Sequence, residues 1–92
     1  MKAIGYIFER GVDSDLIDQQ QSIDSVANKC GIELVLKTKN FGSHAEIVNF
    51  VHIAEQLGAS AIIVADHEIA KLFVGTTDCT VLYGNKKVEV RS

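Results

Sequence analysis

The stretch GYIFERGVDSDLIDQQQSID, residues 5–24, passes from one hydrophobic period to another, and this change decides the fold. Its first residues belong to the apolar run KAIGYIF, residues 2–8, which predicts a buried central strand. From residue 13 onward the apolar side chains recur at helical spacing instead, at Leu16, Ile23 and Ala27. We therefore predict a strand, a charged loop and a helix.

The helix should end at Gly31, because glycine readily adopts the left-handed conformation that follows a helix. Cys30 continues the apolar stripe, and we predict that it is a small core residue rather than a reactive thiol. Residues 32–39, IELVLKTK, predict a second strand. Ser43 and Glu46 have the spacing of a capping box and predict the start of a second helix.

The remaining segments complete an alternating pattern of strands and helices. ASAIIVA, residues 59–65, predicts a strand that is buried on both faces, and residues 66–75 predict a short helix. Two last strands flank Gly84 and Asn85, a two-residue link typical of a hairpin. The order β-α-β-α-β-α-β-β predicts an α/β fold in a single domain, residues 1–92. It has three layers, with a mainly parallel sheet, helices on both faces and a C-terminal antiparallel hairpin.

Composition excludes several classes of protein. The chain has 92 residues and a formal net charge of −3, which argues against binding nucleic acid through bulk positive charge. A local basic patch, at Lys86, Lys87 and Arg91, is better interpreted as a solvated turn and edge strand. Without a secretory signal or a long apolar run, we expect a cytoplasmic protein with reduced cysteines and no membrane span. We expect neither a cofactor nor a metal.

In open α/β sheets, ligands bind beyond the carboxyl ends of the strands, which here carry three polar loops. In the first loop, Ser14 could be a nucleophile, but the favoured interpretation makes Asp13 or Ser14 the N-cap of the helix. The third loop contains Asp66-His67-Glu68, which could form a metal site or an acid–base site. The favoured interpretation makes Asp66 the N-cap of a short helix and places Glu68 in its first turn, which explains two of the three residues without such a site.

Most of the chain resembles the catalytic domain of the resolvase/invertase family of serine recombinases. The family's first strand begins G-Y, as here at Gly5 and Tyr6, and its first helix carries an acidic residue, a glutamine and an aliphatic residue. Asp18, Gln19 or Gln20, and Ile23 fit that helix pattern. The segment AEQLGASAIIVADHEIAKLF, residues 54–73, resembles the family's later strand and short helix. The resemblance implies a recombinase scaffold and a link to DNA recombination.

The residues that carry the family's chemistry are replaced. The resemblance places the family's first arginine at Phe8 and its nucleophilic serine at Arg10. The aspartate of its D-R-L-x-R motif most nearly matches Glu68, and Lys71 lies one place from the position of an arginine. The altered active-site loop would comprise the residues Phe8, Arg10, Ser14, Gln19, Glu68 and Lys71. Losing the serine and the arginines together removes both covalent attack and charge stabilisation, so we expect no catalytic residues.

The leading hypothesis is therefore a catalytically inactive, resolvase-like domain from a mobile element or phage. It would act as a protein-binding or regulatory module, whose partner is itself, a recombinase or another DNA-associated protein. A homodimer could form through the exposed edge of the closing hairpin.

Two alternatives belong to other classes. A residual DNA strand-exchange enzyme would use Ser14 or another nucleophile, assisted by Arg10 and Lys71. A small nucleotide-binding module would resemble the C-terminal half of universal stress proteins, although the G-x-x-G phosphate turn of that family is missing here.

Overall fold

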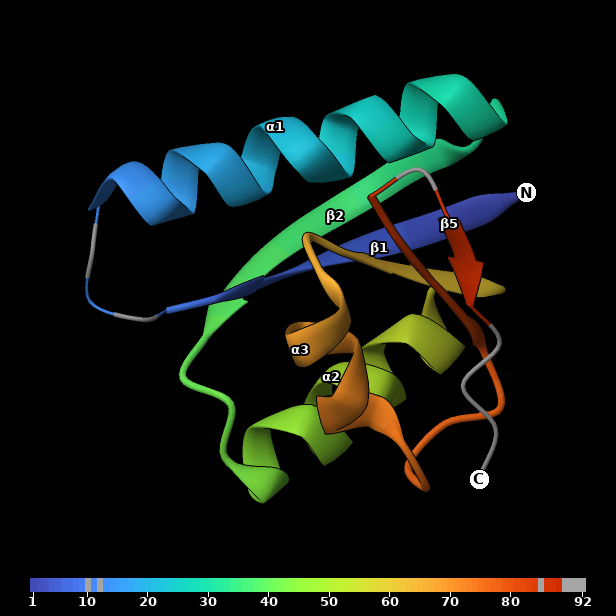
Figure 1. Cartoon of the computed structure of the whole chain (residues 1–92). Coiled ribbons are helices and arrows are strands. Elements are labelled where there is room, and N and C mark those ends of the chain that lie inside the picture. Colours follow the sequence, from blue (N-terminus) through green and yellow to red (C-terminus); the bar gives the residue numbers. More distant parts are fainter. Residues whose placement is uncertain (10, 12, 85, 89–92) are drawn as a thin grey trace.

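The computed structural model describes residues 1–9, 11, 13–84 and 86–88 (Figure 1). Strand β1 (Lys2–Phe8) leads into helix α1 (Asp13–Cys30), which returns the chain to strand β2 (Glu33–Asn40). Helix α2 (His44–Gln56) then connects β2 to strand β3 (Ala61–Val64). This part of the chain follows the predicted order of elements.

The last third of the chain is built from shorter elements. Helix α3 (His67–Ala70) continues directly into a 3₁₀ turn, η1 (Lys71–Phe73), where a single short helix was predicted. Strand β4 (Thr80–Tyr83) follows, and β5 (Lys86–Val88) pairs with it in the antiparallel direction. Residues 85 and 89–92 lie outside the described residues, so the predicted hairpin as a whole, with its Gly-Asn turn, stays a prediction.

The strands form one sheet in the order β2-β1-β3-β4-β5, in which the first four strands are parallel. Helix α1 covers one face of the sheet, and α2, α3 and η1 cover the other (Figure 1). The order changes direction between β1 and β3, because the chain adds β2 on one side of β1 and β3 on the other. The predicted α/β class and its parallel sheet are confirmed.

Each face of the sheet has its own core. Under α1 lie small and branched side chains: Ala3, Ile7, Ile23, Val26, Ala27, Ala61, Ile63 and Leu82. Gly5 allows α1 to come this close, because a Cβ atom there would lie 3.0 Å from Cγ2 of Ile23. Alternate residues of β1 face the opposite core, as the two-residue period of a strand requires.

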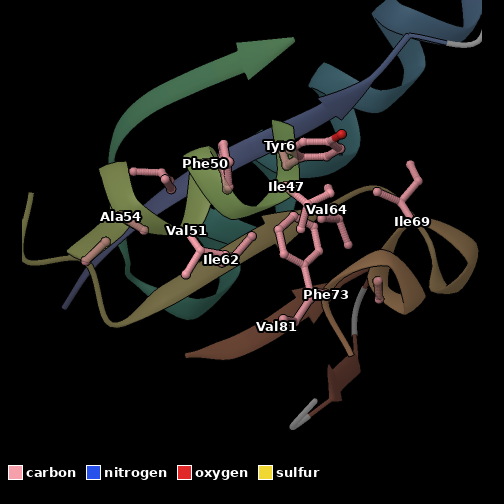
Figure 2. Packing of buried hydrophobic residues seen from close by; sticks show 13 residues of the cluster. Tyr6, Ile47, Phe50, Val51, Ala54, Ile62, Val64, Ile69, Phe73 and Val81 are labelled. Atoms are coloured by element: carbon pink, nitrogen blue, oxygen red, sulfur yellow. The ribbon is translucent and has the colours of Figure 1, made fainter. Parts of the chain in front are cut away.

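The second core is organised around three aromatic rings (Figure 2). Tyr6 makes edge-to-face contacts with Phe50 of α2 and Phe73 of η1, with ring centroids 5.0 and 5.1 Å apart. Such pairs contribute about 0.5–1.5 kcal/mol each beyond the apolar area that they bury. These rings therefore fasten α2 and η1 to the central strand.

Two sequence predictions about α1 are wrong. Cys30 is exposed rather than buried, because it is the last residue of α1 and the chain turns away into β2 directly after it. Ser14 lies inside α1, whose first residue is Asp13, so neither of them precedes the helix as an N-cap. The position before the helix is residue 12, which lies outside the described residues.

Other predictions of local structure are confirmed. Ser43 and Glu46 form both hydrogen-bonded halves of a capping box at the start of α2. Gly31, which was predicted to end the first helix, has a positive φ angle, and so has Gly58 after α2. Among the described residues, no helix has the length and apolar character that crossing a membrane requires.

Candidate functional site

The carboxyl ends of β1, β2 and β3 lie at the same edge of the sheet and define the candidate site. β1 pairs with β3 only as far as Gly5 and Ile63, but it continues beside β2 to Phe8 and Asn40. Among the described residues, no strand therefore lies next to the last residues of β1 on the β3 side. This is the position at which an open α/β sheet leaves a crevice for a ligand.

The side chain of Gln19 occupies this position. Its Oε1 accepts a hydrogen bond of 2.8 Å from the N–H of Phe8, and its Nε2 donates one of 2.7 Å to the Phe8 carbonyl. Nε2 also donates a bond of 2.8 Å to Asp15 Oδ2, one turn earlier in α1. The amide of Gln19 thus pairs with the end of β1 as the peptide group of a neighbouring strand would.

Gln19 is buried, with only 1% of its surface exposed, whereas Gln20 is exposed. Of the two neighbouring glutamines, only Gln19 therefore faces the sheet. An uncharged amide with three short hydrogen bonds has both of its polar atoms engaged. Gln19 is suited to holding the strand and the helix together rather than to moving a proton.

The second loop lies against the end of β1. Gly42 has a positive φ of 82°, and a Cβ atom there would lie 2.8 Å from the ring of Phe8. Phe8 is half-buried and packs at the margin of the aromatic core. The Phe8 side chain therefore places an apolar ring at the carboxyl end of β1.

Glu46 uses both carboxylate oxygens at the start of α2. Its Oε1 accepts from the N–H and hydroxyl of Ser43, and its Oε2 accepts from the N–H of Phe41. These bonds, above all the one from the Ser43 hydroxyl, lower the pKa of Glu46. The carboxylate thereby fills the N-terminus of the helix, where a bound anion would otherwise be stabilised.

Tyr6 brings an unusual polar atom to the same region. The residue is completely buried, and its hydroxyl has no hydrogen-bond partner among the described residues. Figure 2 shows the ring packed beside Phe50, with its oxygen pointing away from the aromatic cluster. Burial raises the pKa of this phenol to about 12, helped by the charge of Glu46 and opposed by the backbone of Gly42.

In the third loop, Asp66 and Glu68 stabilise the start of α3, as predicted. Asp66 is the N-cap of α3, and its Oδ1 accepts a bond of 3.0 Å from the N–H of Ile69. Glu68 lies in the first turn and pairs with Lys71 at 3.4 Å. His67 is exposed, and its Nδ1 lies 3.1 Å from the hydroxyl of Tyr83 at the end of β4.

The structure brings together only part of the altered active-site loop. Phe8 and Gln19 are in direct contact. Ser14 is exposed on α1, whereas Glu68 and Lys71 belong to the helical segment on the opposite face of the sheet. Arg10 lies outside the described residues.

Sequence reasoning missed the unpartnered hydroxyl of Tyr6 and the contact between His67 and Tyr83. The strand pattern indicated that Tyr6 is buried, but no pattern in the sequence reports whether a buried hydroxyl has a partner. His67 and Tyr83 are 16 residues apart, so they meet only through the sheet. Within residues 1–9, 11, 13–84 and 86–88, no three His, Cys, Asp or Glu side chains are grouped to hold a metal ion.

We predict that Gln19→Ala lowers the free energy of unfolding by about 2–4 kcal/mol, because it strips partners from two buried backbone groups of Phe8. Gln20→Ala is the matched control and should change stability by about 0.5 kcal/mol or less, since Gln20 is exposed. Urea denaturation followed by circular dichroism measures both. Equal stability of the two variants would contradict the role assigned to Gln19.

We predict that Tyr6→Phe folds at least as stably as the wild type at pH 7, because it removes a buried hydroxyl without a partner but keeps the ring. Because burial raises the pKa of Tyr6 to about 12, ionisation of this phenol adds no penalty to folding below pH 10, and the free energy of unfolding falls as the pH rises from 10 through about 12. Stability should therefore fall more steeply above pH 10 in the wild type than in Tyr6→Phe. Tyr83→Phe is the control and should retain the steep fall; a shallow fall there, or none in the wild type, would refute the assignment.

The chain was also compared with known proteins. No family model matches it, and neither the curated proteins nor the solved structures contain a significant match. The resemblance to serine recombinases therefore continues to rest on the sequence motifs alone.

Proposed function

We propose that this chain is a resolvase-like domain that does not cut DNA and acts as a protein-binding module in the regulation of recombination. The observation that carries the proposal is the end of β1, where the resemblance places the family's first arginine. Phe8 stands there, with its ring against Gly42 and its backbone bonded to Gln19. An apolar side chain at this position cannot stabilise a charged phosphoryl group.

Among the described residues, two other groups that strand exchange would use, Lys71 and Ser14, are separated from each other. Attack of a serine on a DNA phosphate requires cationic groups that converge on the reacting phosphate. Lys71, which lies nearest in the sequence to one of the family's arginines, pairs with Glu68 in its own helical segment. Ser14 lies on the helix that covers the opposite face. This separation supports a non-catalytic domain over a residual strand-exchange enzyme.

Exposed apolar side chains support binding to a protein. Phe41, directly after β2, has 72% of its surface exposed, and Ile17 in α1 has 57% exposed. Phenylalanine is enriched in protein interfaces, where burying such a ring contributes favourable free energy. We further propose a cytoplasmic setting, in which the two free cysteines, Cys30 and Cys79, would stay reduced.

The absence of catalysis is tested with supercoiled plasmid DNA. The chain is incubated with DNA that carries a recombination site, the reaction is stopped with detergent, and protein bound covalently to DNA is separated by electrophoresis. We expect no adduct, whereas an active serine recombinase from the same genome serves as the positive control. An adduct that disappears in the Ser14→Ala variant would refute the proposal and support the strand-exchange alternative.

Binding is tested by mixing the chain with that recombinase and measuring co-elution by size-exclusion chromatography with light scattering. We expect a complex, and we expect Phe41→Asp to weaken it by about tenfold or more, since the change places a charge in an apolar contact. Val74→Asp is the matched control, because Val74 is also exposed, with 59% of its surface accessible, but lies after η1. The proposal fails if the proteins do not co-elute and strand exchange is unaffected.

A further inference from the structure

The two edges of the sheet are formed by β2 and β5. β2 forms one edge with eight residues, and β5, described over residues 86–88, forms the other. A long edge strand offers a row of backbone donors and acceptors on which another strand can pair. Beside this edge, Val35 and Leu36 have 36% and 38% of their surfaces exposed. The β2 edge is therefore long enough to pair with an added strand.

The regular part of β2 begins after a bulge. Ala3 pairs with Leu34 and Ile4 with Leu36, so Val35 is an extra residue in the strand. From Leu36 to Asn40 the register with β1 is continuous. A partner strand would pair along this regular half, because a bulge disrupts the ladder.

The direction of the backbone groups follows from a single hydrogen bond. The N–H of Glu9 donates to the Asn40 carbonyl at 2.8 Å, so Asn40 turns its polar backbone groups toward β1. Successive residues of a strand alternate, and Lys39 and Lys37 therefore direct theirs outward. The accessible backbone of this edge belongs to these two lysines.

Charge decides which strand fits. In an antiparallel pair of two such edges, Lys37 would stand opposite Lys37 or Lys39 of the second copy, and like charges directly opposite one another are destabilising. Lys37 Nζ lies 3.2 Å from a carboxylate oxygen of Asp24 and Lys39 Nζ lies 3.6 Å from one of Glu9, with 34% and 56% of the lysine side chains exposed. Ion pairs at a protein surface are worth about 0–1 kcal/mol, so an incoming carboxylate can share these lysines at little cost.

The two faces of the edge set the pattern of the partner. Lys37 lies on the α1 side of the sheet, because Asp24 belongs to α1, and Lys39 shares its face. Leu36 lies on the opposite face, where an apolar side chain of an added strand would pack against its exposed surface. We propose that the β2 edge binds an extended segment of a partner protein in which acidic and apolar residues alternate, adding it to the sheet as a sixth strand.

This inference rests on the proposed function and names the kind of segment that the module would bind. The probe is a fluorescent, terminally blocked peptide of alternating glutamate and valine, as long as the eight-residue strand β2. We expect saturable binding in fluorescence anisotropy. In ¹H–¹⁵N spectra of the full chain, the largest shifts should fall on the amides of Lys37 and Lys39.

Two control peptides separate the sources of binding. A lysine–valine peptide should bind at least about tenfold more weakly, because its charges oppose those of the edge. A glutamate–valine peptide with N-methylated backbone should not bind, because it lacks donors for the ladder. Equal binding of the unmethylated glutamate–valine and lysine–valine peptides would overturn the inference, and so would chemical-shift changes centred away from β2.

A charge-reversal variant completes the test. Lys39→Glu should weaken binding of the glutamate–valine peptide about tenfold and strengthen binding of the lysine–valine peptide, with its fold checked by circular dichroism. Lys29→Glu, in the last turn of α1, is the control and should leave both affinities unchanged. If the chain binds the recombinase but Lys39→Glu has no effect on either peptide, the inference fails while the proposed function stands. Self-association of the chain through the β2 edge, at the protein concentration used in the peptide titrations, would also contradict the inference.

Discussion

The central strand β1 extends beyond β3 at its carboxyl end, and the backbone groups of Phe8 must find partners there. Gln19 supplies both, with hydrogen bonds of 2.8 and 2.7 Å from a buried amide. A buried polar group without a partner would cost about 1–3 kcal/mol, so this contact constrains how α1 lies on the sheet. The same side chain occupies the position at which a parallel sheet of this order commonly binds a ligand. One residue therefore affects both the stability of the fold and the candidate site.

The sequence allowed most of the elements to be predicted because their signals are local. The apolar run of β1, the capping box of α2 and the glycines after the helices each act within a few residues. The choice between Gln19 and Gln20 is not local, since neighbouring residues of a helix point about 100° apart and the sheet decides which is covered. One signal was present: Gln19 lies four residues before Ile23 and therefore shares its buried face.

Tyr6 illustrates what a sequence pattern leaves open. Its ring fits the prediction of a buried strand and contacts both Phe50 and Phe73. Phenylalanine would make the same ring contacts, and the hydroxyl adds only the cost of removing a polar atom from water. Buried polar atoms without a partner are rare in folded proteins, and this one lies next to the loop that carries Gly42. The partner of a buried hydroxyl depends on the packing of distant segments, which no local pattern in the sequence reports.

The hydrogen bonds around that end also bear on what the domain can do. Stabilising a charged transition state requires donors that are already aimed at it and are not used by the protein. Here the Phe41 and Ser43 amides donate to Glu46, the Ile69 amide donates to Asp66, and the amide of Gln19 holds β1. Each would have to break an internal bond before it could reach a phosphate. Binding through exposed apolar side chains and a strand edge requires no such rearrangement, and it uses the groups that this fold leaves accessible.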